Sequence, residues 1–292
     1  MRYETGGQLA GLWNCRNNGE RYLTSLRRIP AETDLADSRT QWVGADSILF
    51  ATTHRPWPAP MAPWIMTQRW NDLLFLHYSL APEAVRAVVP DMLTLDTYGQ
   101  RAWITVAPFW INHMRPPGVP SLPWFSHFAE INVRTYVTFG GKPGVYFFSL
   151  DASNLSAVWG ARVFYRLPYW QASMKVKGKG GAEIEYTSKR QHGPKPAELK
   201  CAYGPANRRS FHARPGSLEH FLTERYCLYV VSRKRLYRGE IHHLPWELQD
   251  AMVDVEENTM TQSTGLELPE QADVALFARE LKVLFWAPER LL

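Results

Sequence analysis

The chain has 292 residues, a hydrophobic content of 45% and a formal net charge of +5. This length can bury a large core, and this hydrophobic content excludes global disorder. No stretch approaches the roughly 20 apolar residues of a membrane-spanning helix, and no secretory signal opens the chain. The cysteine count is three, with no CxxC pair, which indicates reduced thiols, so we expect a cytoplasmic protein.

The chain divides at about residue 60. Residues 1–45 are polar and show no sustained periodicity, and the proline-rich stretch 55–63 predicts a stiff, extended linker. We therefore expect residues 1–59 to form a poorly structured extension with its linker. Residues 60–292 are expected to form a single domain.

Positive charge is concentrated in residues 175–240. The lysines there cluster around the glycine-rich turn 177–181, and no nucleic-acid-binding motif accompanies them. This pattern is typical of a solvated hairpin tip, so we expect no nucleic-acid partner.

The first elements after the linker are short. Residues 75–79 and 103–109 predict strands, and residues 82–89 predict a helix whose first turn holds Pro82, where a missing N–H costs nothing. Residues 115–123 contain four prolines and a glycine, which predicts a loop.

The most informative stretch starts at residue 128. From residue 130 to residue 139 polar and apolar side chains alternate, so a strand there has two different faces. The polar face carries a carboxylate, an amide, a guanidinium and a phenol, from Glu130, Asn132, Arg134 and Tyr136. The next strand, 145–150, is apolar on both faces, which indicates a deeply buried region. A buried polar row must be satisfied by hydrogen bonds or be functional.

The remaining elements are again mostly strands. Residues 154–165 predict a helix, with an N-cap from Asp151, Ser153 or Asn154 and a shared face of Leu155, Val158, Trp159 and Arg162. Further strands are predicted at 170–174, 184–188, 199–203, 226–232, 236–242 and 274–286, with a helix near 218–224. Many strands separated by turns indicate a closed barrel or a sandwich.

Three segments carry a family resemblance: 128–137, 144–152, and Ala161-Arg162 followed by Leu167-Pro168-Tyr169. With flanking motifs such as 75–78 and 224–226, they resemble the YqjF-like family of bacterial proteins. That family is a domain of unknown function in the acetoacetate-decarboxylase-like superfamily, and the resemblance covers about residues 60–290. It implies a mainly β fold, namely a closed antiparallel β-barrel with flanking helices and a central pocket.

The resemblance also implies where catalytic lysines would lie. In decarboxylases of this superfamily, a lysine after the turn that follows the helix forms a Schiff base with the substrate ketone, and a second lysine lowers its pKa. The corresponding turn here is 167–168, and it is followed by Tyr169 and Trp170, neither of which can form an imine. The nearest lysines, Lys175 and Lys177, lie beyond the strand. A Schiff-base decarboxylase mechanism is therefore not expected.

The retained polar residues suggest another chemistry. Glu130 and Tyr169 are the candidate catalytic residues, as base and acid on a bound carbonyl compound. The candidate substrate-binding residues are Arg134, Arg162, Asn132 and Tyr136. Arginine presents a planar fork that suits a carboxylate. The structural alternative is an ion pair of Glu130 with one of the two arginines, which would brace the barrel.

Metal, nucleotide and cofactor sites are not expected. His242 and His243 are adjacent and point in opposite directions on a strand, and the chain contains no HExxH or GxGxxG motif. Three functions remain: an enzyme with lyase-like chemistry on a small oxo-acid or carbonyl compound, a non-catalytic module that binds an apolar or anionic small molecule, or a protein-interaction role. The expected partner is a small-molecule ligand, with no membrane partner, and the oligomeric state, a homo-oligomer included, stays open.

Overall fold

The computed structural model of the chain describes residues 46–160, 162, 165–193 and 195–292. Residues 1–45, which the sequence assigns to the extension, lie outside this description. The helices are α1 (Asp46–Leu49), α2 (Pro82–Arg86), α3 (Pro123–Ser126), α4 (Leu155–Gly160) and α5 (Leu218–Thr223). The strands are β1 (Met66–Leu80), β2 (Thr94–Leu95), β3 (Ala102–Arg115), β4 (Phe128–Phe139), β5 (Lys142–Ala152), β6 (Tyr169–Lys177), β7 (Ile184–Arg190), β8 (Glu198–Pro205), β9 (Cys227–Ser232), β10 (Arg235–His242), β11 (Leu248–Asn258), β12 (Val274–Phe285) and β13 (Glu289–Arg290).

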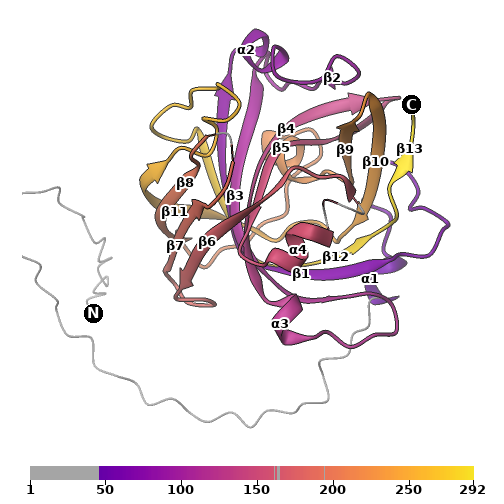
Figure 1. Cartoon of the computed structure of the whole chain (residues 1–292), viewed down its shortest axis with the longest axis horizontal. Coiled ribbons are helices and arrows are strands. Elements are labelled where there is room, and N and C mark those ends of the chain that lie inside the picture. The colour runs from indigo at the N-terminus through magenta and orange to yellow at the C-terminus, as the bar shows by residue number, and fades with distance from the viewer. Residues whose placement is uncertain (1–45, 161, 163–164, 194) are drawn as a thin grey trace, which may run out of the picture. The chain divides into compact units, whose positions relative to one another are not determined.

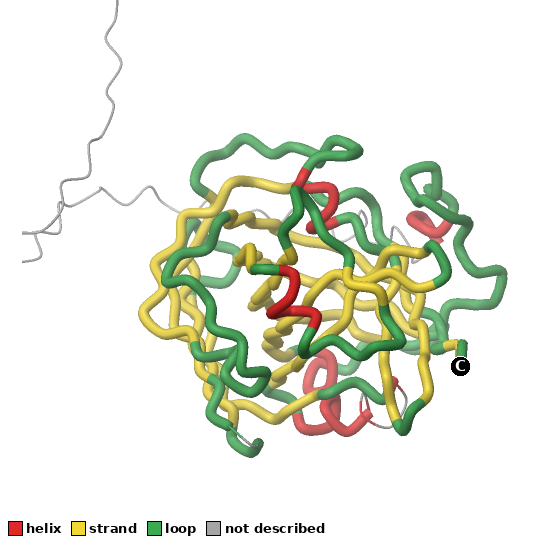
Figure 2. The backbone as a smooth tube through the Cα atoms, turned by 90° about the horizontal axis from the view of Figure 1, so that it is seen from above, coloured by secondary structure: helices red, strands yellow, loops and turns green. Residues whose placement is uncertain are grey.

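The described fold is mainly β, as expected, with short and separate helices (Figure 2). None of these described helices is both long and apolar enough to cross a membrane.

The strands close into two rings that share one wall. Strands β12, β1, β3, β4 and β5 pair in this order and form the wall. From β5 the larger ring returns to β12 through β6, β7, β8 and β11, and the smaller ring returns through β9 and β10. In Figure 1 the two groups of strands lie on opposite sides of β3. The closed barrel expected from the resemblance is therefore confirmed.

One part of that expectation is wrong, because the barrel is mixed rather than antiparallel. Strand β5 pairs in parallel with both β6 and β9. Between β5 and β6 the chain crosses over through α4, and such a crossover returns the next strand in the same direction. The two rings separate at β5, because β6 leads into the larger ring and β9 into the smaller one.

Strand β4 is buried on both faces because it belongs to the shared wall. Ile131 and Val133 pack into one hydrophobic core with Tyr186 of the larger ring, whereas Phe128 and Tyr136 pack into the other core. Successive side chains of a strand point to opposite faces, so the polar residues between Phe128 and Tyr136 point into the smaller ring. This arrangement places the polar row inside the protein.

Helix α4 differs from its expected orientation. Asn154 caps it, as predicted, by accepting a hydrogen bond of 3.1 Å from the backbone N–H of Ala157. However, Leu155 and Trp159 are 55% and 68% exposed, whereas Ala157 and Val158 are buried. The helix makes fewer than two turns at about 3.6 residues per turn, and the small side chain of Ala157 lets it lie close to the barrel. The predicted face of Leu155, Val158 and Trp159 is therefore not the buried face, since Val158 alone of these three is buried.

Residues 46–59 pack on the barrel and are not poorly structured. The buried guanidinium of Arg55 pairs with Glu240 at 3.1 Å and donates a 2.6 Å hydrogen bond to the carbonyl oxygen of Ile241. Ile48 is 6% exposed, and its carbonyl oxygen lies 2.6 Å from Nε2 of His242. The domain thus begins before residue 60, since a solvated linker would not bury an arginine.

Candidate functional site

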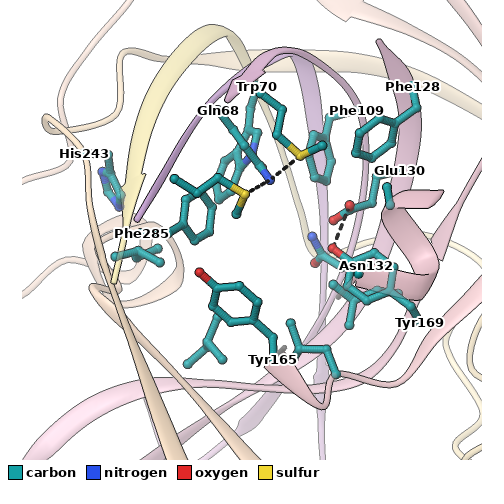
Figure 3. A pocket seen from close by; sticks show the side chains of 18 of the residues that line it. Gln68, Trp70, Phe109, Phe128, Glu130, Asn132, Tyr165, Tyr169, His243 and Phe285 are labelled. Atoms are coloured by element: carbon teal, nitrogen blue, oxygen red, sulfur yellow. Dashed lines mark hydrogen bonds between the residues drawn. The ribbon is translucent and has the colours of Figure 1, made fainter. Parts of the chain in front are cut away.

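The smaller ring encloses a cavity of about 660 Å³. Its lining is mostly apolar and comes from the strands of the smaller ring, from α4, from the loop after β3, and from the segments that follow α4 and α5. Figure 3 shows Glu130, Asn132 and Tyr169 on one side of this cavity and His243 on the other, with Phe109, Phe128 and Phe285 around it. A cavity of this size and apolar character is typical of sites for small organic ligands.

Glu130 lies on the cavity wall and carries no counter-ion. It is 4% exposed, and its Oε2 accepts a 2.8 Å hydrogen bond from the hydroxyl of Tyr169. Burial, and to a smaller extent the charge of Asp151, raise the pKa of Glu130 to about 8, although the hydrogen bond from Tyr169 lowers it. The carboxyl group is therefore mostly protonated at neutral pH and can donate a hydrogen bond of its own.

Arg134 is a buried charge of the cavity without an ionic partner among the described residues. Its side chain lines the cavity, and the residue is 8% exposed. Its Nε is buried without a hydrogen-bond partner, and no described residue pairs with the guanidinium. The guanidinium carbon lies 5.4 Å from the ring centre of Phe75, which supplies an aromatic face but no negative charge. An isolated buried charge is costly, so this guanidinium is suited to an anionic partner.

Two further arginines contrast with Arg134. Arg225 also lines the cavity, but its guanidinium donates a 2.7 Å hydrogen bond to Asp96. Arg162, a candidate substrate-binding residue, is exposed and does not line the cavity; its Nε donates a 2.6 Å hydrogen bond to the carbonyl oxygen of Tyr169. Arg162 therefore supports the backbone of Tyr169 rather than facing a ligand.

The other two candidates on β4 separate in the same way. Asn132 lines the cavity, and its Oδ1 is buried without a hydrogen-bond partner. Tyr136 is fully buried; its hydroxyl donates a 2.9 Å hydrogen bond to the carbonyl oxygen of Leu222 and lies 2.6 Å from Oγ1 of Thr105. Asn132 is thus available to a ligand, whereas Tyr136 braces the wall below the cavity.

The structural ion pair considered for Glu130 is absent among the described residues. The buried pair of this region is formed instead by Asp151 and Arg190, which make two hydrogen bonds of 2.7 Å. Arg190 reaches β5 from β7, a connection that the sequence does not reveal. Glu130 is left unpaired because Arg190 satisfies the neighbouring carboxylate.

No lysine belongs to the described lining of the cavity. Lys175 and Lys177 are exposed on β6, and Lys177 pairs with Glu185 at the surface. Tyr169 occupies the first position of β6 and points at Glu130. The described part of the chain also brings no three His, Cys, Asp or Glu side chains together in a group that could hold a metal.

Gln68 and His243 line the cavity and were missed in the sequence. The Nε2 atom of Gln68 lies 3.7 Å and 3.5 Å from the sulfurs of Met66 and Met114, and its Oε1 accepts a 2.8 Å hydrogen bond from Trp70 (Figure 3). The predicted strand begins at residue 75, whereas β1 begins at Met66. A prediction that began at residue 66 would have placed Met66, Gln68 and Trp70 on one face, because every second side chain of a strand points the same way. His243 offers no comparable signal, since it follows the end of β10.

The closed mixed barrel with its cavity has the acetoacetate-decarboxylase-like fold. The enduracididine biosynthesis enzyme MppR complexed with pyruvate is similar in structure, with a TM-score of 0.54 and 13% identity over 80% of this chain and 92% of that one. Acetoacetate decarboxylase from Legionella pneumophila subsp. pneumophila str. Philadelphia 1 has a TM-score of 0.54 and 12% identity, over 83% and 94% of the two chains. Identities this low show the fold alone.

The family follows from the sequence itself. The model of the family described as "Uncharacterized conserved protein" matches residues 67–282. The uncharacterized protein YqjF of Bacillus subtilis (strain 168) is 46% identical over 227 residues, which are 78% of this chain and 93% of that protein. The chain therefore belongs to this YqjF-like family, and the resemblance inferred from its motifs is confirmed.

Proposed function

We propose that the cavity binds a small organic carboxylate. The observation that carries this proposal is Arg134, a buried guanidinium that lines the cavity and has no anionic partner among the described residues. Arginine keeps its charge in proteins, and its planar fork matches the two oxygens of a carboxylate. The amide of Asn132, two residues away on the same strand face, can donate a further hydrogen bond to the ligand.

The pair of Glu130 and Tyr169 supports acid–base chemistry on the same ligand. The Tyr169 hydroxyl is occupied by Oε2 of Glu130, so the proton of the neutral Glu130 carboxyl is free to approach a carbonyl oxygen. Donation to that oxygen withdraws electrons from the neighbouring carbon, which is the usual role of a general acid. We therefore place a second polar group of the ligand, a carbonyl, beside Glu130.

A role as a Schiff-base decarboxylase is not supported, because an amine is needed to form the imine and Tyr169 lies where the resemblance would place a lysine. The proposal accordingly combines carboxylate binding with lyase-like chemistry that uses Glu130. A non-catalytic binding module is the alternative, and turnover separates the two.

Calorimetric titration of the full chain tests the proposal. The ligands are pyruvate, acetoacetate, butyrate and decanoate, each beside its uncharged amide. We expect at least one carboxylate to bind, and its amide to bind more weakly. Arg134→Met should weaken the binding of the carboxylate by roughly 10- to 100-fold, because hydrogen bonds to a charged group are lost. The control Arg101→Met, at an exposed arginine, should leave the affinity unchanged. If no carboxylate binds, or if Arg134→Met binds as the wild type does, the proposal fails.

A second arm follows the bound oxo-acids by nuclear magnetic resonance. Consumption that stops in Glu130→Gln, with binding retained, supports the enzyme. Binding without consumption of any carboxylate supports the binding module instead.

A further inference from the structure

The cavity is much larger than a short oxo-acid requires. A volume of about 660 Å³ lies in the middle of the range of roughly 300–1,000 Å³ that sites for drug-sized ligands occupy. Most of its wall is hydrocarbon, including Phe109, Met114, Phe128, Phe147, Leu150 and Phe285. A ligand of a few atoms would leave most of this apolar wall uncovered, so the wall points to a ligand with a large apolar body.

The polar groups of the wall are arranged along β4, from the mouth of the cavity to its closed end. Along β4, Phe128 comes first, Glu130 and Asn132 follow, and Arg134 is the last of these lining residues. At about 3.3 Å per residue, Phe128 and Arg134 are roughly 20 Å apart along the strand. A ligand whose carboxylate reaches Arg134 can therefore be long if its other end lies near Phe128.

The Arg134 end is closed. Tyr136 is the next residue on this face of β4, and its hydroxyl donates a hydrogen bond to the carbonyl oxygen of Leu222 in α5. Trp246 donates a 2.9 Å hydrogen bond to the carbonyl oxygen of Thr223, and its ring lies 5.0 Å from that of Phe75, over which the Arg134 guanidinium lies. These groups form a floor, so a carboxylate enters from the opposite end.

The Phe128 end is open and mostly apolar, although the partly exposed Arg115 also lines the cavity there. Ile65, Val119 and Leu122 line the cavity there and are 39%, 45% and 44% exposed. Trp124 and Trp159, which lie close in sequence to the lining residues Leu122 and Gly160, are 77% and 68% exposed. Lining residues with this exposure mark the mouth. A mostly apolar mouth favours a hydrocarbon chain. Arg115 is partly exposed to water there, whereas Arg134 is 8% exposed, so the buried guanidinium gains more from a carboxylate partner.

We infer that the ligand is an aliphatic carboxylic acid of medium or long chain length, bound with its carboxylate inward. The carboxylate contacts Arg134 and Asn132. The chain then passes the neutral Glu130, which is where a carbonyl of the chain would lie, and it ends at the mouth. Neutral Glu130 matters here, since an ionised carboxylate beside the chain would add an unpaired charge to an apolar surface. This inference rests on the proposed function, since it specifies the carboxylate that the cavity binds.

The test is a calorimetric series of unbranched acids on the full chain, from acetate through hexanoate and decanoate to palmitate, with pyruvate included. Burial of each added methylene should tighten binding by about fourfold until the chain reaches the mouth, after which affinity should level off. Affinity that does not change with chain length, in the presence of measurable carboxylate binding, overturns the inference and leaves the proposed function intact. If no carboxylate binds, both this inference and the proposed function are wrong.

Orientation is tested with 10-hydroxydecanoate and decanol. With the carboxylate inward, the added hydroxyl of 10-hydroxydecanoate lies at the mouth in water, so it should bind within a few-fold of decanoate. Arg134→Met should bind decanoate at least tenfold more weakly than the wild type does. It should bind decanol, which has no carboxylate, as tightly as the wild type does. A large change in affinity caused by the terminal hydroxyl, in either direction, would show that the chain end does not lie in water at the mouth and would overturn the inference, as would decanoate binding that is insensitive to Arg134→Met. Should Arg134→Met not fold, the hydroxylated acid still decides on the wild-type chain.

Discussion

Tyr169 and Glu130, which lie 39 residues apart in the chain, are joined by a hydrogen bond of 2.8 Å across the wall of the cavity. The bond connects the start of β6 to the middle of β4, and it holds a carboxyl group that burial keeps mostly protonated at neutral pH. The tyrosine stands where the resemblance to decarboxylases would place an imine-forming lysine. The cavity thus presents a phenol, hydrogen-bonded to a neutral carboxyl group, where the resemblance would place an amine.

The raised pKa of Glu130 predicts a pH-dependent stability. The unfolded carboxyl has a pKa near 4.5 and the folded one about 8, so the folded state holds more protons between these values. The contribution of Glu130 to the free energy of unfolding should therefore fall as pH rises from about 5 to 8, by up to about 3 kcal/mol. Glu130→Gln should remove this part of the pH dependence. Urea unfolding of both proteins at pH 5 and pH 8 measures it, and equal pH dependence in the two would refute the neutral Glu130.

The buried ion pair of Asp151 and Arg190 should dominate local stability. Both side chains are 1% exposed, so Arg190→Leu leaves an unpaired buried carboxylate and should lower the free energy of unfolding by about 3–5 kcal/mol. The double change with Asp151→Asn should recover much of this loss. Lys177→Leu, which breaks an exposed pair with Glu185 between β6 and β7, is the control and should cost less than about 1 kcal/mol. A similar small effect at Arg190 would contradict the assigned pairing.

Docking of residues 46–59 can be measured through Arg55. The Arg55 side chain is fully buried against Glu240, which also contacts Arg238 and Lys142. Arg55→Met removes the ion pair and the hydrogen bond to the backbone of Ile241, and it should lower the melting temperature by several degrees, as a loss of about 1–2 kcal/mol does in a domain of this size. An unchanged melting temperature would show that the segment does not stabilise the barrel.

Borohydride reduction in the presence of acetoacetate should label no lysine. The described cavity wall contains no amine, and Lys175 and Lys177 are exposed on the outside of β6. Peptide mass spectrometry after reduction gives the answer. A reduced adduct at either lysine would restore a Schiff-base mechanism.

Much of the barrel was predictable because its signals are local. The alternation in residues 130–139 gave β4 and its polar face, and the glycine-rich turn after Lys177 gave the pairing of β6 with β7. The proline loop and the cap at Asn154 also follow from single residues. These features depend on backbone preferences that neighbouring residues set.

Other features depend on contacts between distant parts of the chain. Strand β11 was not predicted, and it links two distant parts of the chain by pairing with β8 and, at its start, with β12. The Arg190 that satisfies Asp151 comes from a strand 39 residues later, so Glu130 could not be recognised as unpaired from sequence. Arg162 was assigned to the pocket from the resemblance, but its guanidinium turns outward, over the ring of Trp170. The direction in which a side chain points at the end of a short helix is set by tertiary packing, which the sequence does not show.

The central claim, that Arg134 holds the carboxylate of a bound acid, is tested most directly on the ligand itself. The measurement is a pH titration of the carboxyl resonance of ¹³C-carboxyl decanoate bound to the full chain and to Arg134→Met. An adjacent guanidinium favours the ionised carboxylate, so the pKa of the bound acid should lie about 1–3 units lower in the wild type than in Arg134→Met. Equal carboxyl pKa values in the two complexes would contradict the account, because they would show that the carboxylate does not lie on Arg134.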